Sequence, residues 1–242
     1  MPSGVFADTP RFSPDSLQLS FNHGTTGGDD SLAVIGADGN NLKVLASDCS
    51  VFCQHSWHPT NGEIFFPTSD GVKAVASTGG TPRVVHDPFG YISGVEVSPD
   101  GQFMAFDSFD LELLRFSDNT TQELIAGANV DGVRFSPDGK KLLYIDAPTD
   151  SIRILDLETS ATATVVDTDN YLTSADWFPD GKRVAVITDD GIEVFMRQDG
   201  AAPTRQLLRK GFALKSLDVS PDGKSIAYCI NGQSSIFVLS GL

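Results

Sequence analysis

Apolar and polar residues alternate in short runs along the whole chain, and many of these runs are separated by turn-forming tetrapeptides. In residues 133–145, VRFSPDGKKLLYI, one apolar run enters a Ser-Pro-Asp-Gly turn and a second run leaves it. Proline presets φ in such a turn, aspartate bonds back to the backbone, and glycine adopts positive φ. The segment therefore predicts a β-hairpin.

This hairpin recurs six times, with its proline at positions 14, 59, 99, 137, 179 and 221. In the second copy Asn61 stands in place of the turn glycine, and asparagine is the next residue to tolerate positive φ. Large apolar residues stand two positions before, and five and seven after, every proline, and such alternation marks the buried face of a strand. The first of these positions holds Phe12, Trp57, Val97, Phe135, Trp177 and Val219. A β-rich unit repeated about every forty residues predicts a repeat architecture.

Two further extended runs follow each hairpin. The third strand is predicted at 32–35, 72–75, 111–116, 152–157, 192–195 and 236–239, and a fourth at 42–46, 82–85, 121–125, 164–166 and 205–208. Four antiparallel strands per repeat form a propeller blade. We therefore predict an all-β fold, a single six-bladed β-propeller over residues 1–242, with blades at about 5–46, 47–86, 87–126, 127–167, 168–209 and 210–242. The sixth repeat has no obvious fourth strand, so its blade is expected to be three-stranded or to pack directly on the first blade; a chain cut from a longer protein is the alternative.

The repeated pattern Ser-Pro-Asp-Gly-Lys-x-Ile/Leu-x-Tyr/Phe resembles the WD40-like PD repeat (PD40) of the TolB-type six-bladed propellers. The same repeat occurs in the propeller domains of prolyl-oligopeptidase-type peptidases. The resemblance extends over essentially the whole chain, and it implies the fold more than the function, because the same blades serve many purposes. Nothing in the chain corresponds to the α/β domain of TolB or to the hydrolase domain of the oligopeptidases.

The chain is strongly acidic, with 32 Asp and Glu against 17 Lys and Arg and a net charge of −15. Such a surface repels phosphate backbones, so nucleic acid is not an expected partner. No apolar run reaches the length of a membrane span. Cys49 and Cys53 are close enough to pair, but the odd total of three cysteines favours buried thiols.

Aspartates concentrate in the loops of one propeller face, formed by the connections between second and third strands and between blades. The connections between second and third strands contribute Asp29, Asp30, Asp70, Asp107, Asp110, Asp146, Asp150, Asp189 and Asp190, and those between blades contribute Asp48, Asp87, Asp167 and Asp169. Aspartate is a common turn residue and acidic surfaces keep proteins soluble, which is the plain structural explanation. The functional alternative is a face that meets a basic peptide, a Lys/Arg-rich protein or Ca²⁺.

Polar residues on the innermost strands form two predicted rings around the channel. Three positions before the prolines stand Arg11, Ser56, Glu96, Arg134, Asp176 and Asp218. Salt bridges between blades, such as Glu96 with Arg134, are the favoured explanation of this ring, and contact with a ligand is the alternative. Nearer the channel mouth stand Asp8, Asp131 and Lys215, which are kept as candidate partner-binding residues because relatives bind partners at the pore mouth.

The sequence contains no Gly-x-Ser-x-Gly nucleophile elbow, and its four histidines lie apart, so no catalytic residues are predicted. We predict a non-enzymatic, monomeric binding scaffold that recognises a basic protein or peptide at the acidic loop face and channel mouth, without a cofactor. The alternatives are a Ca²⁺-dependent propeller enzyme acting on a sugar or lactone, and the gating propeller of a larger hydrolase. The compartment stays open: cytoplasmic if Met1 is native, periplasmic or secreted if a signal peptide was removed.

Overall fold

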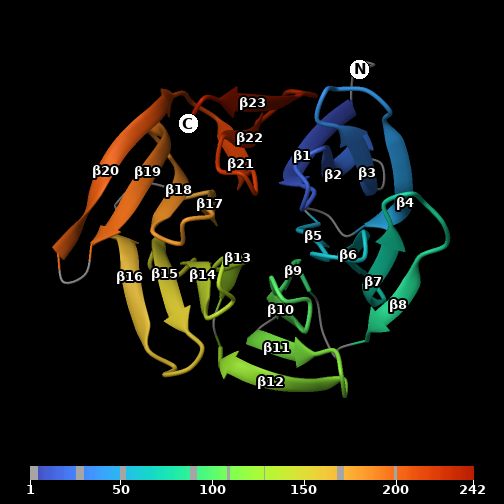
Figure 1. The fold of residues 1–242 in the computed structure, drawn as a ribbon, viewed down its shortest axis with the longest axis horizontal. Coiled ribbons are helices and arrows are strands. Elements are labelled where there is room, and N and C mark those ends of the chain that lie inside the picture. The colour runs from blue at the N-terminus through green and yellow to red at the C-terminus, as the bar shows by residue number, and fades with distance from the viewer. Residues whose placement is uncertain are drawn as a thin grey trace.

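The computed structural model describes residues 5–25, 30–49, 53–87, 92–107, 110–127, 129–167, 172–198 and 201–242. These residues form 23 strands in six antiparallel sheets and contain no helix, and hence no helix long enough to cross a membrane. The sheets stand around a central axis as the blades of a propeller (Figure 1). The predicted fold is confirmed.

Each blade is a simple meander in which consecutive strands pair. Blades 1 to 3 contain β1 (Val5–Phe12), β2 (Gln18–Thr25), β3 (Asp30–Gly36) and β4 (Lys43–Cys49); β5 (Ser56–Trp57), β6 (Glu63–Thr68), β7 (Gly71–Ala76) and β8 (Arg83–His86); β9 (Gly94–Val97), β10 (Phe103–Asp107), β11 (Leu111–Arg115) and β12 (Thr120–Ile125). Blades 4 to 6 contain β13 (Val130–Phe135), β14 (Lys141–Asp146), β15 (Ser151–Asp156) and β16 (Thr162–Asp167); β17 (Ser174–Trp177), β18 (Arg183–Thr188), β19 (Gly191–Gln198) and β20 (Ala201–Lys210); β21 (Leu214–Val219), β22 (Ser225–Ile230) and β23 (Ile236–Ser240). The three-stranded last blade is thus confirmed for the described part of the chain.

The Ser-Pro-Asp-Gly turn is built by side-chain hydrogen bonds as well as by its backbone. In blade 3 the Ser98 hydroxyl donates to Asp100 Oδ1 at 2.6 Å and accepts the backbone N–H of Phe103 at 2.9 Å. Asp100 Oδ1 also accepts the N–H of Gln102 at 3.0 Å, and Gly101 has φ +69°. The Ser98 bond is the largest factor holding the pKa of Asp100 below its ordinary value. The turn aspartates therefore stay ionised.

The turn of blade 2 differs from the prediction. Asn61 does not take the positive φ expected of it; Gly62, the next residue, does, with φ +71°. The side chain of Asn61 instead accepts the N–H of Glu63 at 2.9 Å, the bond that aspartate makes in the other turns. Glycine adopts the left-handed backbone conformation at the lowest cost, and in this turn Gly62 adopts it in place of Asn61.

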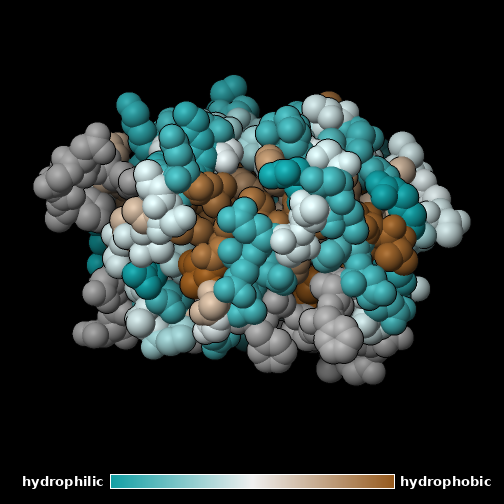
Figure 2. Space-filling model, turned by 90° about the horizontal axis from the view of Figure 1, so that it is seen from below, coloured by the Kyte–Doolittle hydropathy of each residue, from teal (hydrophilic) through white to brown (hydrophobic). Residues whose placement is uncertain are grey.

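The hydrophobic core lies between neighbouring blades. One cluster joins Trp177 of blade 5 to Val165 and Val166 on the outer strand of blade 4, and another joins Trp57 of blade 2 to Leu45 on the outer strand of blade 1. Seen from the side of blade 3, hydrophilic residues cover most of the described surface and hydrophobic ones show in patches between them (Figure 2). The outer strand of each complete blade therefore helps to cover the next blade.

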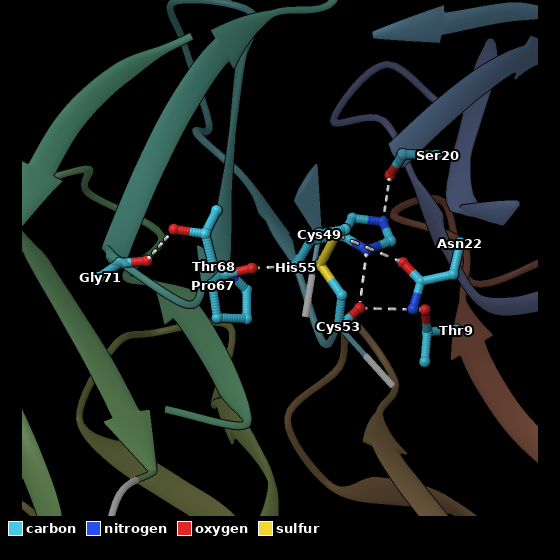
Figure 3. The surroundings of a disulfide bond; sticks show 9 residues. All are labelled: Thr9, Ser20, Asn22, Cys49, Cys53, His55, Pro67, Thr68 and Gly71. Atoms are coloured by element: carbon cyan, nitrogen blue, oxygen red, sulfur yellow. Dashed lines mark hydrogen bonds between the residues drawn. A yellow bond between two sulfur atoms is a disulfide. The ribbon is translucent and has the colours of Figure 1, made fainter. Parts of the chain in front are cut away.

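A disulfide joins Cys49 to Cys53, so the expectation of buried free thiols is wrong for this pair. The end of β4 and the connection to blade 2 bring the two Cα atoms to 5.8 Å, within the range for a disulfide. Figure 3 shows it beside His55, whose Nδ1 lies 3.2 Å from the Cys53 carbonyl oxygen and whose Nε2 lies 2.7 Å from Ser20 Oγ. Burial, aided by the charge of Arg11, lowers the pKa of His55 to about 3, so this imidazole is neutral. Cys229 remains a buried free thiol.

Blade 6 closes the ring by packing directly on blade 1. Asp218 on β21 accepts the N–H of Phe12 on β1 at 2.7 Å, and the Ser216 hydroxyl donates to Asp8 at 2.9 Å. Asp8 also forms an ion pair with Lys215. Two residues predicted to bind a partner thus bond to each other across the seam of the ring.

Candidate functional site: the central channel

The innermost strands bring charged side chains together in the middle of the channel. The guanidinium of Arg11 donates to Asp218 Oδ1 and to the carbonyl of His55, each at 3.0 Å, and forms an ion pair with Glu96. Arg11 is only 6% exposed. The ion pair with Glu96 reaches from blade 1 to blade 3, past the short side chain of Ser56 on blade 2.

Arg134 extends this network on the other side of the channel. Its Nη1 lies 4.0 Å from Glu96 Oε2 and its Nε lies 3.9 Å from Asp176 Oδ1, so the predicted pairing of Glu96 with Arg134 is confirmed. Among the described residues Arg134 Nε has no hydrogen-bond acceptor, although it is buried. A buried donor without an acceptor costs free energy. The N–H at Arg134 Nε is therefore still able to donate a hydrogen bond within the ring.

Burial and crowding shift the acid–base properties of the ring. Burial, followed by the charge of Asp218, raises the pKa of Asp176 to about 7. Burial also lowers the pKa of Arg134, and the charge of Arg11 acts in the same direction. For Arg11 burial opposes ionisation, but the charges of Glu96 and Asp218 outweigh it and raise its pKa. The ring therefore holds two guanidinium groups against three carboxyl groups, one of which titrates near neutrality.

A cavity of about 340 Å³ opens above this ring, on the face of the Pro-Asp-Gly turns. Its rim contains the proline of every repeat, Pro14, Pro59, Pro99, Pro137, Pro179 and Pro221. Its wall contains the apolar residue two positions earlier in every repeat, Phe12, Trp57, Val97, Phe135, Trp177 and Val219, and its floor contains Arg11, Ser56, Glu96, Asp176 and Asp218. The apolar residues two positions before the prolines are buried, as predicted. They also line this cavity, which we call the funnel and whose floor consists mainly of charged residues.

In five repeats the rim proline is followed directly by a turn aspartate: Asp15, Asp100, Asp138, Asp180 and Asp222. Three of these turns also carry a lysine two residues after the aspartate, Lys140, Lys182 and Lys224. Two of these aspartates form ion pairs within their own turns, Asp180 with Arg183 at 2.6 Å and Asp222 with Lys224 at 3.5 Å.

The acidic loops predicted as a binding face lie at the opposite end of the propeller and are not uniformly accessible. Asp8, Asp30 and Asp107 are buried, so they are not surface contacts for a partner. Asp29 lies outside the described residues. Among the loop residues predicted to bind a partner, Asp70, Asp150, Asp189 and Asp190 are exposed and Asp110 and Asp146 are half-buried; of the channel-mouth residues, Asp131 is exposed and Lys215 half-buried.

Several of these loop carboxylates already have partners within the protein. Asp146 pairs with Arg153 at 3.1 Å and Asp190 with Arg205 at 2.8 Å. Asp131 accepts a hydrogen bond from Gln54 at 2.5 Å. Internal cations thus offset part of the negative charge of the loop face, and a binding role for its exposed aspartates stays a prediction.

The fold and the channel define a six-bladed β-propeller whose funnel leads to a buried ion network. No family model matches the chain, and no curated protein matches it either. Among solved structures it is similar to TolB from Acinetobacter baumannii, with a TM-score of 0.73 and 18% identity, over 98% of this chain and 61% of that chain.

Two further solved structures have a similar fold. The calcium-binding protein regucalcin from Agrobacterium tumefaciens gives a TM-score of 0.74 at 12% identity, over 98% of this chain and 90% of that chain. A chain of a nidogen/laminin complex gives 0.74 at 12% identity, over 88% and 87%. At these sequence identities the structural similarity shows the propeller fold only. The function has to be argued from the residues of the site.

Proposed function

We propose that this protein is a non-enzymatic binding scaffold, TolB-like in the use of its channel mouth, that takes a segment of a protein or peptide into the proline-rimmed funnel. The observation that carries the proposal is the cavity of about 340 Å³, to which every repeat contributes a rim proline and an apolar wall residue. Prolines and inner strands hold this shape before any partner arrives, which lowers the ordering cost of binding.

The chemistry of the funnel favours a basic side chain as the inserted group. The floor has three carboxyl groups, Glu96, Asp176 and Asp218, against the one guanidinium of Arg11, and the wall includes Trp57, Trp177 and two phenylalanines. A lysine or arginine over an aromatic face gains a cation–π interaction that grows as water is excluded. Turn aspartates next to the rim prolines, such as Asp15 and Asp100, would attract such a partner toward the opening.

A Ca²⁺-dependent enzyme, the alternative from the sequence, has less support. An ion in the channel would have to take its carboxylate ligands from Arg11 and Arg134, which engage Glu96, Asp176 and Asp218. Binding of a cationic side chain at the wall requires no such exchange. The acidic loop face remains the competing location for the same kind of partner.

Intrinsic fluorescence tests the proposal, because the chain has two tryptophans and both line the cavity. Short peptides with a central arginine or lysine would be titrated into the protein, with alanine-centred peptides as matched controls. We expect the basic peptides alone to change the tryptophan emission, with an affinity that falls as salt rises. The double variant Glu96→Gln, Asp176→Asn should weaken this binding.

Charge reversal on the loop face is the control for location. The exposed residues Asp150 and Asp189 would be replaced by lysine together, which should leave binding at the funnel unchanged. If the basic peptides bind without a fluorescence change, and Asp150→Lys with Asp189→Lys abolishes that binding, the partner site is the acidic loop face and the funnel proposal is wrong. Failure of all basic peptides to bind would also refute it.

A further inference from the structure

The third strand of blade 6 is more exposed than the third strands of the other blades. Ile236 begins the third strand of blade 6 and is half-buried. Its counterparts, each placed at the same step of the third strand, are 0% exposed: Leu32, Val72, Leu111, Ile152 and Ile192. Val238 is 46% exposed, whereas Val34, Ala74, Ile154 and Val194 at the same step are at most 6% exposed and Leu113 of blade 3 is half-buried. The third strand of blade 6 therefore lacks a cover that the fold supplies elsewhere.

The backbone of β23 also has an open edge, since no described strand lies beyond it (Figure 1). The N–H of Gly241 donates inward to the carbonyl of Lys224 at 3.0 Å. Inward and outward bonding alternate along an antiparallel strand, so Ile236, Val238 and Ser240 direct their N–H and C=O groups to the open edge. These groups are arranged to pair with an added strand.

This edge lacks the features that discourage strand addition. Exposed edges are normally protected by charged residues or proline. Each of the other five outermost strands carries a charged residue, for example Lys43, Arg83, Glu123, Asp167 and Arg205. The sequence of β23, Ile-Phe-Val-Leu-Ser, has no charge and no proline.

We propose that β23 is a docking edge for an extended segment of a partner protein, which adds to blade 6 as its fourth antiparallel strand. Main-chain hydrogen bonds would supply affinity and the neighbouring blade would select side chains, as in other cases of strand addition. This site lies on the outside of the ring and is independent of the funnel. Nothing in its argument depends on the proposed function of the channel.

The five complete blades specify what the added segment should look like. In each of them the fourth strand has one extra residue, a bulge, at the same place. In blade 1, for example, Leu32 pairs with Ala46 and the next residue, Ala33, pairs with Val44, so that one residue of the fourth strand between them has no partner. The residue at the bulge is always a large aliphatic one: Leu45, Val85, Leu124, Val165 and Leu208. Leu45 and Val165 are 8% and 7% exposed and pack against the next blade. The partner segment should therefore carry leucine or valine where it passes Ile236 and Phe237.

A partner segment fits this edge better than a second copy does. A second copy would offer its own β23, which pairs with β22 without any register shift. Every strand that fills this place in the protein carries the bulge, and the bulge directs its aliphatic residue to the next blade. At the seam with blade 1 that residue would reach Ile35 and Ile236, which are only partly buried.

The test uses a labelled peptide with the sequence of residues 39–47, Gly-Asn-Asn-Leu-Lys-Val-Leu-Ala-Ser, from the covering strand of blade 1. Binding to the full chain would be followed by fluorescence anisotropy, and amide exchange would report on β23. We expect saturable binding and slower exchange at Ile236 and Val238. The same peptide with Leu45→Asp should bind at least about tenfold more weakly, since the buried aliphatic anchor is gone.

Two variants of the protein make the test specific. Val238→Pro removes an N–H that faces the open edge, so it breaks no hydrogen bond of the blade and should abolish binding. Val238→Thr keeps the N–H and should retain binding. Equal binding by the wild type and Val238→Pro, or no binding by the wild type at millimolar peptide, overturns the proposal. So does a dimer that Val238→Pro dissociates, because the edge then belongs to a second copy.

Discussion

Replacing Asp107 by asparagine should make the protein less sensitive to rising pH. Asp107 ends β10 and is 1% exposed. Its Oδ1 accepts hydrogen bonds from the Ser93 hydroxyl at 2.7 Å and from the N–H of Gly94 at 2.5 Å, while its Oδ2 is buried without a partner among the described residues. Burial is the main cause that raises the pKa of Asp107 from 3.8 to about 7.

The sign of the effect follows from proton binding. Between pH 3.8 and about 7 the folded state keeps the proton on Asp107 that the unfolded state has released. Stability therefore falls as pH rises through this window, and the loss is complete above the folded-state pKa. With these two pKa values the linkage relation gives a loss of about 2.5 kcal/mol between pH 5 and pH 8. Asparagine keeps one acceptor oxygen for Ser93 and Gly94 and carries no charge to desolvate.

The assay is urea unfolding of wild type and Asp107→Asn at pH 5 and pH 8. Other groups titrate in both proteins, so the difference between their pH slopes isolates Asp107. We expect the wild type to lose about 2.5 kcal/mol more than the variant over this range. Parallel slopes would mean that Asp107 is ionised at little cost in the fold, and the argument from its burial would be refuted. For the same reason Asp107→Lys should unfold the protein, unlike a reversal at an exposed loop aspartate.

Three further predictions concern the channel and the core. Arg11→Met should cost about 3 to 5 kcal/mol, because it leaves buried carboxylates unpaired, and adding Glu96→Gln should restore part of this in denaturant unfolding; a loss below about 1 kcal/mol would contradict the network. Trp177→Ala should cost about 3 to 5 kcal/mol as a truncation between blades 4 and 5, and a loss below about 1 kcal/mol would mean that its burial contributes little. Millimolar Ca²⁺ against EDTA should leave the melting temperature unchanged, since arginines engage the channel carboxylates; a rise of several degrees would show a native-state ion site and favour the enzyme alternative.

The fold could be predicted from sequence because its signals are local. The turn tetrapeptide and the alternating apolar positions recur in every blade, so each hairpin specifies its own register. Outer strands were predicted less completely: 205–208 lies inside the observed β20, Ala201–Lys210. Outer strands face water on one side, and residues such as Thr204 and Gln206 give no apolar alternation there.

The site could be predicted only in part because it arises from ring closure. The positions of Arg11, Glu96 and Arg134 on the inner strands were evident, but the pairing of Arg11 on blade 1 with Glu96 on blade 3 arises only when the ring closes. The wall residues were recognised as apolar hairpin positions. Six of them form a funnel only when the ring brings their strands around one axis, and no segment of the chain carries that information by itself.

The loop aspartates show how a small backbone difference separates a surface charge from a buried one. Asp70 and Asp107 both stand near the end of a second strand, but Asp70 lies beyond the end of β6 in a turn, whereas Asp107 is the last residue of β10 and pairs with Gly94 inside the sheet. Glycine at that position leaves room for the carboxylate: a Cβ on Gly94 would lie 3.2 Å from Asp107 Oδ2 and 2.9 Å from the Cβ of Gln54. Gly94→Ala should therefore displace Asp107 and remove the pH dependence assigned to it. The burial of this carboxyl group therefore depends on the glycine that pairs with it as well as on Asp107 itself.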